Sequence, residues 1–361
     1  MDKPQLLGMP LPELTSFVES LGERAFHARQ IRSALLRGCT FGEMTELSKP
    51  FRALLEAHAS TGIPTIVTKL ESGRDETVKF LFALADGQAV ESVLMAYKHG
   101  NTLCISTQVG CAMGCAFCAS AVGGKVRDLS GSEMLGQVVA AGTYVRKTRE
   151  LAAGRRAIDN VVLMGSGEPL DNFDNVVSFL RMLSDPEGPC LSLRHVSVST
   201  CGLPQRMRAL TDEGLSVTLC ISLHAPNDHI RKKIMPVASA YPIEEVIKAA
   251  RYHVQRTGRR VIFEYILIDG INDRIEHARE LAARLRGLQC HVNLIAYNPV
   301  DHAGVSAPSQ RAMQQFEQEL TRAHISCTRR RVLGADIEGA CGQLRRRTLE
   351  NGAGGIKGDK A

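Results

Sequence analysis

Three cysteines with the spacing C-x3-C-x2-C form the most informative chemical pattern in the sequence. They are Cys111, Cys115 and Cys118, in the segment VGCAMGCAFCAS. A cubic 4Fe-4S cluster normally takes four thiolates, so three cysteines leave one iron open to a ligand from outside the protein, where chemistry can occur. The alternative is a structural zinc site. Such sites usually pair C-x2-C with a second cysteine pair or with histidines, and the sequence has no second pair of that spacing.

Further polar residues follow predicted strands, where ligand-binding loops of parallel sheets lie. The segment GSGEP, residues 165–169, has two glycines that let backbone approach a ligand, and its Glu168 can accept hydrogen bonds from an ammonium group. Neutral hydrogen-bonding groups that suit a ribose and an adenine end later strands: Ser199 with Thr200, Ser222 to His224, and Asn298. Taken singly, each is more often a turn residue or a cap, but together they form a candidate ligand site.

The elements that must position these residues are apolar strands alternating with helices. Six strands are predicted, at residues 102–107, 160–165, 195–200, 217–224, 261–268 and 292–297, and helical stretches lie at 133–148, 242–255 and 276–286. This alternation favours parallel strands with right-handed crossovers. A barrel and an open doubly wound sheet would give nearly the same pattern. In both, ligand-binding loops lie at the C-terminal ends of the strands.

The segments before and after this region differ from it in pattern. Residues 11–57 predict short amphipathic helices, and Asp86-Gly87 between two β-rich runs predicts a hairpin. The predicted domains are a helical accessory domain at 1–60, a β-hairpin connector at 61–96, a core at 97–344 and a flexible, polar, Gly-rich tail at 345–361.

Composition sets the class of protein. The chain has 361 residues, 44% of them hydrophobic, which suits one large α/β domain with a smaller appendage. No apolar run approaches the roughly 20 residues of a membrane helix and no signal peptide is evident, so we expect a cytoplasmic protein without membrane contact. Eleven cysteines in such a chain predict reduced thiols that serve metal or redox chemistry. The net charge of +6 is mild for a nucleic-acid binder and does not decide the substrate.

The cysteine motif, with Phe117 just before its last cysteine, resembles the signature of radical S-adenosylmethionine (SAM) enzymes. More of the chain resembles one branch of them, the RlmN/Cfr family, which methylates adenine carbons in RNA. The segments that carry this resemblance cover residues 90–344: VESVLM, TLCISTQVGCAMGCAFCAS, NVVLMGSGEPLDN, VSVSTCG, ISLHAPND, IMPV, RRVIFEYILIDGINDRIEHA, VNLIAYNP and DIEGACGQL.

The resemblance implies a fold, cofactors and a set of ligand contacts. The fold would be α/β, a radical SAM partial (β/α)6 TIM barrel with the small N-terminal helical domain as an RNA-binding accessory. One 4Fe-4S cluster would be held by Cys111, Cys115 and Cys118. The residues that would bind SAM are Glu168, Pro169, Ser199, Ser222, Leu223, His224 and Asn298.

The resemblance also gives roles to two further cysteines and one glutamate. Cys341, in ACGQL, would take a methyl group from a first SAM and become S-methylcysteine. A second SAM would give a 5'-deoxyadenosyl radical, and the methylene radical formed on sulfur would add to the adenine ring. Glu91 would accept the ring proton, and Cys104 would resolve the covalent adduct through a transient disulfide with Cys341. Without the resemblance, Cys104 is a small buried hydrophobe and Glu91 a surface residue.

The implied activity is methylation of adenine carbon 2 in 23S ribosomal RNA and in some tRNAs by a monomer, with an external electron donor such as flavodoxin. GEP in place of the Cfr-like GEA favours carbon 2 over carbon 8. The sequence departs from the family at Ser166, Lys125 and Leu333, where the family usually has methionine, an aromatic residue and arginine. These departures bear on which RNA and which carbon is methylated.

Two other functions remain open at this stage. A radical SAM enzyme acting on a protein or a small molecule would need the same cluster loop, but it would give Cys104 and Cys341 no purpose. Methylation of adenine carbon 8, or radical SAM chemistry on another RNA, is the alternative within RNA-modifying enzymes. A non-catalytic RNA-binding protein would use the cysteine loop for structural zinc. Brown colour and broad absorbance in anaerobically purified protein would distinguish an iron-sulfur enzyme from that binding protein.

Overall fold

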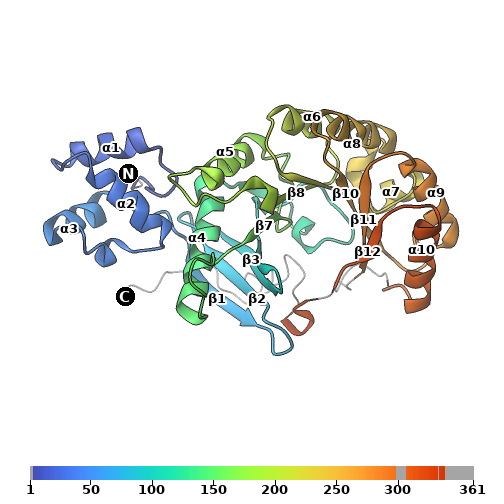
Figure 1. Cartoon of the computed structure of the whole chain (residues 1–361), viewed down its shortest axis with the longest axis horizontal. Coiled ribbons are helices and arrows are strands. Elements are labelled where there is room, and N and C mark those ends of the chain that lie inside the picture. The colour runs from blue at the N-terminus through green and yellow to red at the C-terminus, as the bar shows by residue number, and fades with distance from the viewer. Residues whose placement is uncertain (1–2, 298–305, 332, 338–361) are drawn as a thin grey trace.

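The computed structural model describes residues 3–297, 306–331 and 333–337. A group of short helices lies at one end of the molecule, and a large sheet with its covering helices forms the rest (Figure 1). Within the described residues, no helix is both long and apolar enough to cross a membrane.

A single ten-stranded sheet organises the large region. Its strand order is β1-β2-β3-β4-β7-β8-β9-β10-β11-β12, antiparallel from β1 to β4 and parallel from β4 to β12. The strands are β1 (Thr65–Glu71), β2 (Val78–Ala83), β3 (Ala89–Tyr97), β4 (Gly100–Cys104), β7 (Asn160–Leu163), β8 (Val196–Thr200), β9 (Thr218–Ser222), β10 (Val261–Leu267), β11 (Cys290–Ala296) and β12 (Cys327–Arg329). The six predicted strands correspond to β4 and β7 to β11.

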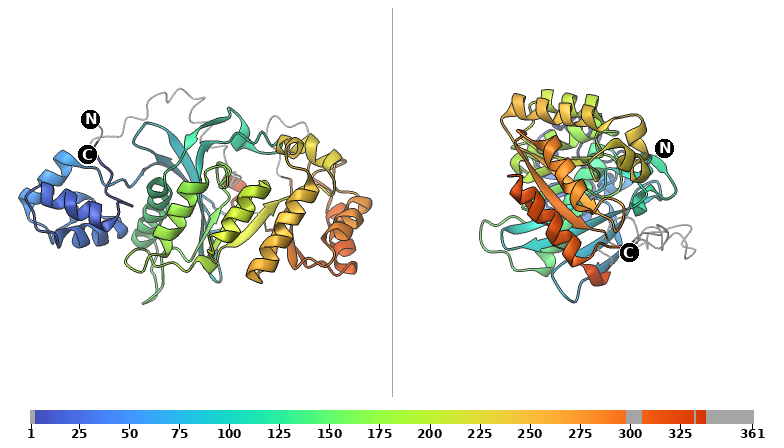
Figure 2. Two further views of the ribbon diagram at one scale, coloured as in Figure 1. Left: turned by 90° about the horizontal axis from the view of Figure 1, so that it is seen from above. Right: turned by 90° about the vertical axis from the view of Figure 1, so that its right-hand side faces the viewer.

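The helices of this region follow the strands along the chain. They are α4 (Gly131–Thr148), α5 (Phe173–Ser184), α6 (Pro204–Asp212), α7 (Asp228–Ile234), α8 (Ile243–Thr257), α9 (Ile275–Leu285) and α10 (Gln310–Arg322). Figure 2 shows that the long helices lie along one face of the curved sheet. Helices on one face are typical of a barrel, whereas a doubly wound sheet carries them on both faces. The barrel alternative is therefore the correct one.

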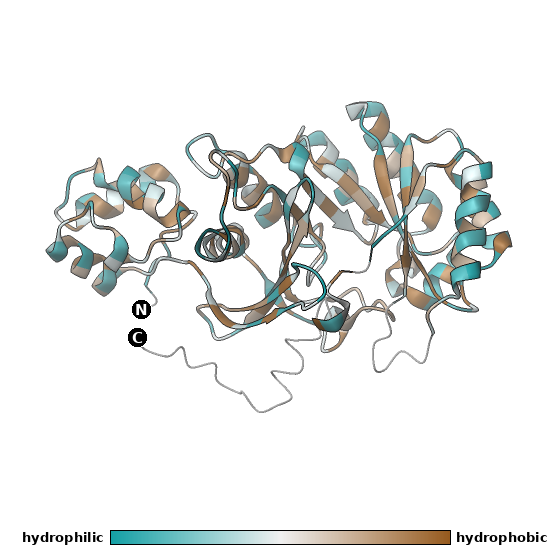
Figure 3. Ribbon diagram, turned by 60° about the horizontal axis from the view of Figure 1, so that its bottom comes forward, coloured by the Kyte–Doolittle hydropathy of each residue, from teal (hydrophilic) through white to brown (hydrophobic). Residues whose placement is uncertain are grey.

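Local sequence explains where several helices begin and end. Ser130 caps α4, because its hydroxyl accepts from the Glu133 N–H and the Glu133 carboxylate accepts from the Ser130 N–H. Helix α8 ends at Gly258, whose φ of 66° is the left-handed conformation that glycine adopts readily. The apolar sides of these helices join the strands in one continuous core that includes Phe179, Phe263 and Leu281. Brown, hydrophobic colouring accordingly dominates the strands in Figure 3.

The predicted hairpin is confirmed. Strands β2 and β3 pair in antiparallel register, and the Leu84 N–H donates to the Gln88 carbonyl across the turn that contains Asp86 and Gly87. The sequence did not predict β1, nor the small separate sheet of β5 (Gln108–Gly110) and β6 (Lys125–Asp128) that flanks the cysteine loop. The hairpin extends the barrel sheet, since β3 pairs with β4. The domain boundary drawn at residues 96 and 97 stays a prediction.

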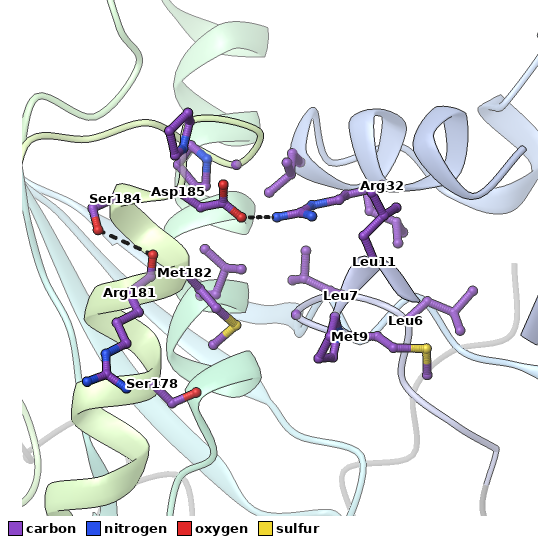
Figure 4. A pocket seen from close by; sticks show the side chains of 18 of the residues that line it. Leu6, Leu7, Met9, Leu11, Arg32, Ser178, Arg181, Met182, Ser184 and Asp185 are labelled. Carbon is purple, nitrogen blue, oxygen red and sulfur yellow. Dashed lines mark hydrogen bonds and ion pairs between the residues drawn. The ribbon is translucent and has the colours of Figure 1, made fainter. Parts of the chain in front are cut away.

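The N-terminal helices are α1 (Leu11–Ser20), α2 (His27–Leu36) and α3 (Lys49–His58), as the amphipathic pattern predicted. A groove of about 600 Å³ separates them from α5 and the loop that follows it (Figure 4). Its walls are largely apolar, with Leu7 and Leu11 on the accessory side and Met182 on the core side. An ion pair between Arg32 and Asp185 crosses the groove.

Candidate active site

A cavity of about 320 Å³ lies at the C-terminal ends of the barrel strands. Seven of the residues predicted for cluster and SAM binding line it: Cys111, Cys115, Cys118, Glu168, Ser199, Ser222 and His224. Pro169 and Leu223 are buried but do not line the cavity. Asn298 lies outside the described residues, as does Cys341.

The cysteine loop joins β5 to the rest of the small sheet and is held by backbone hydrogen bonds. The Cys111 N–H donates to the Gly124 carbonyl at 3.1 Å, and the Ala116 N–H donates to the Ile234 carbonyl at the end of α7 at 2.9 Å. The Cys118 N–H donates to the Cys115 carbonyl at 3.1 Å. The Cys111 bond therefore holds the start of the loop, the Ala116 bond anchors its middle to α7, and the Cys118 bond closes a turn within the loop.

The three cysteines of this loop fit the donor set of an iron-sulfur cluster, in which each thiolate binds a different iron. Burial raises the pKa of Cys111 to about 11 and also raises that of Cys115, so both thiolates need a strongly cationic partner to form. Among the described side chains, no group of three His, Cys, Asp or Glu residues is arranged to hold a single metal ion. A cubic cluster does not require such an arrangement, because its thiolates bind different irons.

Glu168 is positioned by two close approaches of backbone to backbone. A Cβ at Gly165 would stand 2.6 Å from the Ile105 carbonyl oxygen, and one at Gly167, whose φ is 108°, would stand 2.6 Å from the Cβ of Gln108. Only glycine fits at these positions. The Glu168 carboxylate accepts from the Cys201 N–H at 2.7 Å and the Leu170 N–H at 3.0 Å. Burial raises its pKa, while these hydrogen bonds lower it.

His224 is a neutral imidazole in this cavity. It has a φ of 56°, and its Nδ1 accepts from the Ile266 N–H at 3.0 Å. Its ring meets the Phe117 ring edge-on, with the centroids 4.8 Å apart. Burial lowers the pKa of His224 to about 3. The side chain therefore shapes the cavity wall without adding charge near neutral pH.

The three departures from the family pattern all lie close to this region. Lys125 forms ion pairs with Asp128 at 3.0 Å and Asp171 at 2.8 Å. The Ser166 hydroxyl donates to the Gly110 carbonyl at 3.3 Å, just before the cysteine loop. Leu333 packs against the small buried cluster that contains Cys104. Each departing side chain thus has local partners of its own.

Glu91 and Cys104 lie on one face of the sheet but do not line the cavity. Cys104 pairs with Val93, two residues along β3 from Glu91, so the two side chains share that face. Both are buried, and the Glu91 carboxylate is 3.1 Å from the Lys79 ammonium group. The expectation that Glu91 is a surface residue is therefore wrong. The catalytic roles of Glu91 and Cys104 stay predictions. No disulfide joins two of the described cysteines.

The sequence analysis did not assign two charged residues that line the cavity, Glu264 and Arg330. Glu264, on β10, is buried and aligned with Ser222 of β9. Its Oε1 accepts from the Asn293 amide at 2.9 Å, and its other oxygen lies 3.8 Å from the Arg330 guanidinium. Burial raises the pKa of Glu264. The only sequence signal was a lone carboxylate inside the apolar run VIFEYILI.

Comparison with known proteins gives two matches to family profiles. The profile of the radical SAM superfamily matches residues 105–282. The profile of the ribosomal RNA large subunit methyltransferase N-terminal domain matches residues 4–61.

Individual relatives match along nearly the whole chain. A probable dual-specificity RNA methyltransferase RlmN from Clostridium tetani is 45% identical, over 96% of this chain and 97% of that protein. The corresponding protein from Alkaliphilus oremlandii is 46% identical, over 97% of this chain and 100% of its own. The crystal structure of a radical SAM methyltransferase from Sphaerobacter thermophilus superposes with a TM-score of 0.88, at 42% identity over 94% of this chain and 98% of that one.

Proposed function

Because the chain belongs to the RlmN family of radical SAM RNA methyltransferases, we propose that it methylates carbon 2 of an adenine in 23S ribosomal RNA and in some tRNAs. One observation carries the proposal beyond family membership. Residues far apart in the sequence, from Cys111 to Glu264, line a single cavity at the strand ends. A non-catalytic RNA-binding protein would have no need to gather the cysteine loop and the buried carboxylates of Glu168 and Glu264 at one cavity.

The chain's own residues supply the cofactor site. Cys111, Cys115 and Cys118 would hold a 4Fe-4S cluster. Glu168, Ser199, Ser222 and His224 would bind SAM around it, with Pro169, Leu223 and Asn298 as the further contacts that the family implies. When bound, the cluster and SAM supply a 5'-deoxyadenosyl radical. The apolar walls of the cavity, such as Phe117 and Ile266, would keep water from that reactive species.

Three further residues would carry the methyl group and the proton. The Cys341 thiolate would attack the methyl carbon of a first SAM, with S-adenosylhomocysteine as the leaving group, and the S-methyl group would then give up a hydrogen atom to the radical that the second SAM supplies. After the sulfur-bound carbon has joined the adenine and the adduct has lost the one electron that the cluster first supplied, Glu91 would take the ring proton. The Cys104 thiolate would attack the Cys341 sulfur and form a disulfide, and the methylene carbon released from that sulfur would take up a proton to become the methyl group. Two SAM molecules are consumed in each turnover.

The position of Glu91 supports this division of labour. Its carboxylate is buried and lies 3.1 Å from the Lys79 ammonium, so it is held in one place on the sheet face that also carries Cys104. A base and a resolving thiol on one rigid face can act in succession on a single bound adduct. We further propose that the protein acts in the cytoplasm as a monomer and receives electrons from an external donor such as flavodoxin.

The test is mass spectrometry of nucleosides from 23S ribosomal RNA and tRNA of a strain that lacks this gene. We expect 2-methyladenosine to disappear and to return when the wild-type gene is restored. The Cys341→Ala variant should not restore it, whereas Cys190→Ser, which alters an exposed cysteine, should. Loss of 8-methyladenosine in place of 2-methyladenosine would show the Cfr-like alternative. Full methylation by Cys341→Ala would overturn the covalent mechanism.

A further inference from the structure

Arg231 is a fully buried charge that the proposed reaction leaves without a role. Its side chain, on α7, is 0% exposed. One terminal nitrogen donates to the Tyr241 carbonyl at 3.0 Å and the other to the Cys201 carbonyl at 2.5 Å, while its Nε has no hydrogen-bond partner in the described part of the chain. Two neutral carbonyls do not compensate a buried guanidinium, since removing such a charge from water is costly unless a negative charge lies nearby.

No described carboxylate forms an ion pair with Arg231. The acid that acts on it through space is Asp228, and one oxygen of Asp228 already accepts from the Ile243 N–H at 2.8 Å. The other groups whose charge acts on Arg231 are the thiols of Cys201 and Cys115. Of these, Cys115 belongs to the cysteine loop. A cluster bound at this loop would therefore add negative charge on the same side of Arg231 as Cys115.

Backbone geometry supports the same direction. The Ile234 carbonyl of α7 accepts from Ala116, between Cys115 and Cys118, and Arg231 precedes Ile234 by one turn on the buried side of that helix. The Cys201 residue whose carbonyl accepts from Arg231 donates its own N–H to Glu168 at 2.7 Å. Arg231 thus lies directly behind the wall that carries both the cysteine loop and Glu168, although it does not line the cavity.

We infer that Arg231 is the buried counter-charge of the cluster held by Cys111, Cys115 and Cys118, and that it favours the uptake of an electron there. This inference rests on the proposed function for the presence of the cluster. One electron arrives from an external one-electron donor and makes the cluster more negative by one charge. A fixed positive charge nearby lowers the free energy of that added electron, so it raises the reduction potential.

The experiment is a redox titration of the anaerobically reconstituted holoenzyme, without SAM or RNA, followed by electron paramagnetic resonance. In Arg231→Met we expect the equilibrium constant for electron uptake to fall about tenfold, or about 59 mV for a one-electron couple. Arg231→Gln should show a similar loss, and Arg231→Lys, which keeps the charge, should stay close to wild type. A fixed unit charge on the order of 10 Å away, at an effective dielectric constant of about 20, gives an effect of this size.

Arg251 offers a matched control. It is a guanidinium on the neighbouring helix α8 that also donates to two backbone carbonyls, those of Arg284 and Arg286, and it does not line the cavity. Arg251→Met should therefore leave the potential unchanged. If Arg231→Met and Arg251→Met have the same potential, or if Lys and Gln at position 231 behave alike, Arg231 is only a clamp on two carbonyls and the inference is wrong.

Loss of iron gives an equally clear answer. If Arg231→Lys, with an unchanged circular dichroism spectrum, loses its iron as fully as Arg231→Met, charge is not the property that matters and the inference is wrong. The titration needs no RNA, so a potential that follows the charge at position 231 would stand even if the enzyme proved to act on another substrate. Conversely, a reduction potential that does not depend on the charge at position 231 would contradict this inference but not the proposal that the enzyme methylates RNA.

Discussion

The cavity at the strand ends and the groove beside the accessory helices differ in both size and chemistry. The groove is the larger, at about 600 Å³ against about 320 Å³. The ion pair between Arg32 and Asp185 that crosses the groove is partly exposed on both sides. The smaller cavity instead gathers four thiols, those of the cysteine loop and of Cys201, and two buried carboxylates, Glu168 and Glu264.

This difference shows that the reactive site is identified by buried polar groups with fixed hydrogen-bond partners. The volume of a cavity or groove does not identify it. A carboxylate such as Glu168 is costly to bury, and the chain offsets that cost with two backbone N–H donors. Apolar walls such as those of the groove are an ordinary consequence of two packed units. Changes to the cavity should therefore impair cofactor chemistry, while changes to the groove should affect only how the units pack.

The largest effect is expected at the cysteine loop. Cys115→Ala should lose most of its iron and the broad absorbance near about 400 nm that iron-sulfur thiolates give, because one iron would lack its thiolate. Iron analysis and absorbance of anaerobically purified protein measure this. Cys190→Ser, at an exposed position outside the cavity, is the control and should keep both. Full iron content in Cys115→Ala would place the cluster elsewhere.

A large loss of stability is expected at Gly167. An added Cβ would stand 2.6 Å from Gln108 and force a φ of 108° on an L side chain, so Gly167→Ala should lower the free energy of unfolding by about 3 kcal/mol. Gly154, with a φ of 78° and nothing within 4 Å of an added Cβ, is the control, and Gly154→Ala should cost only about 1 kcal/mol. Equal unfolding midpoints for the two variants would contradict the tight approach that positions Glu168.

A pH effect of intermediate size is expected from His224. Its folded pKa of about 3 lies below the unfolded value of about 6.5, so between these values the unfolded state binds more protons and stability falls as pH falls. Wild-type unfolding free energy should decrease by up to about 1.4 kcal/mol more per pH unit below pH 6 than that of His224→Asn. Asparagine tolerates the φ of 56°. Denaturant titrations at pH 7 and pH 5 measure the difference, and parallel curves would show that His224 is not buried as a neutral ring.

The smallest effect is expected in the groove. Arg32→Ala should lower the free energy of unfolding by no more than about 1 kcal/mol, because the side chains of Arg32 and Asp185 are 23% and 33% exposed and water screens their attraction. Iron content and the reduction potential should stay at wild-type values. A change in either would mean that the groove communicates with the cavity, and the contrast between the two regions would fail.

Much of the fold could be predicted from the sequence because its signals are local. The apolar runs of the six strands, the Asp86-Gly87 turn and the C-x3-C-x2-C spacing are each readable within a few residues. Resemblance to a family supplied the roles of Pro169 and Leu223, although their buried side chains do not line the cavity. Local patterns could not show which strand ends meet.

The residues that were missed depend on register and packing. Glu264 enters the cavity because β10 aligns it with Ser222 of β9, a pairing that no local pattern encodes. Arg231 stands beside Lys232 and Lys233 in one short basic run, yet it alone of the three is buried. In a short helix that mixes charged and apolar residues, the sequence does not show which basic side chain is buried. The long-range contacts of α7 with Cys201 and Tyr241 decide it.

The strand order of the sheet has a consequence for the size of what the enzyme can accept. In the described part of the chain, β1 pairs only with β2 and β12 only with β11, so the curved wall never meets itself. A complete barrel fills its interior with side chains and offers a substrate only the rim where its strands end. An open sheet of this shape can receive a folded polynucleotide from the side. Such a molecule needs no free end, and one of its bases can point toward the sulfur atoms of the cysteine loop.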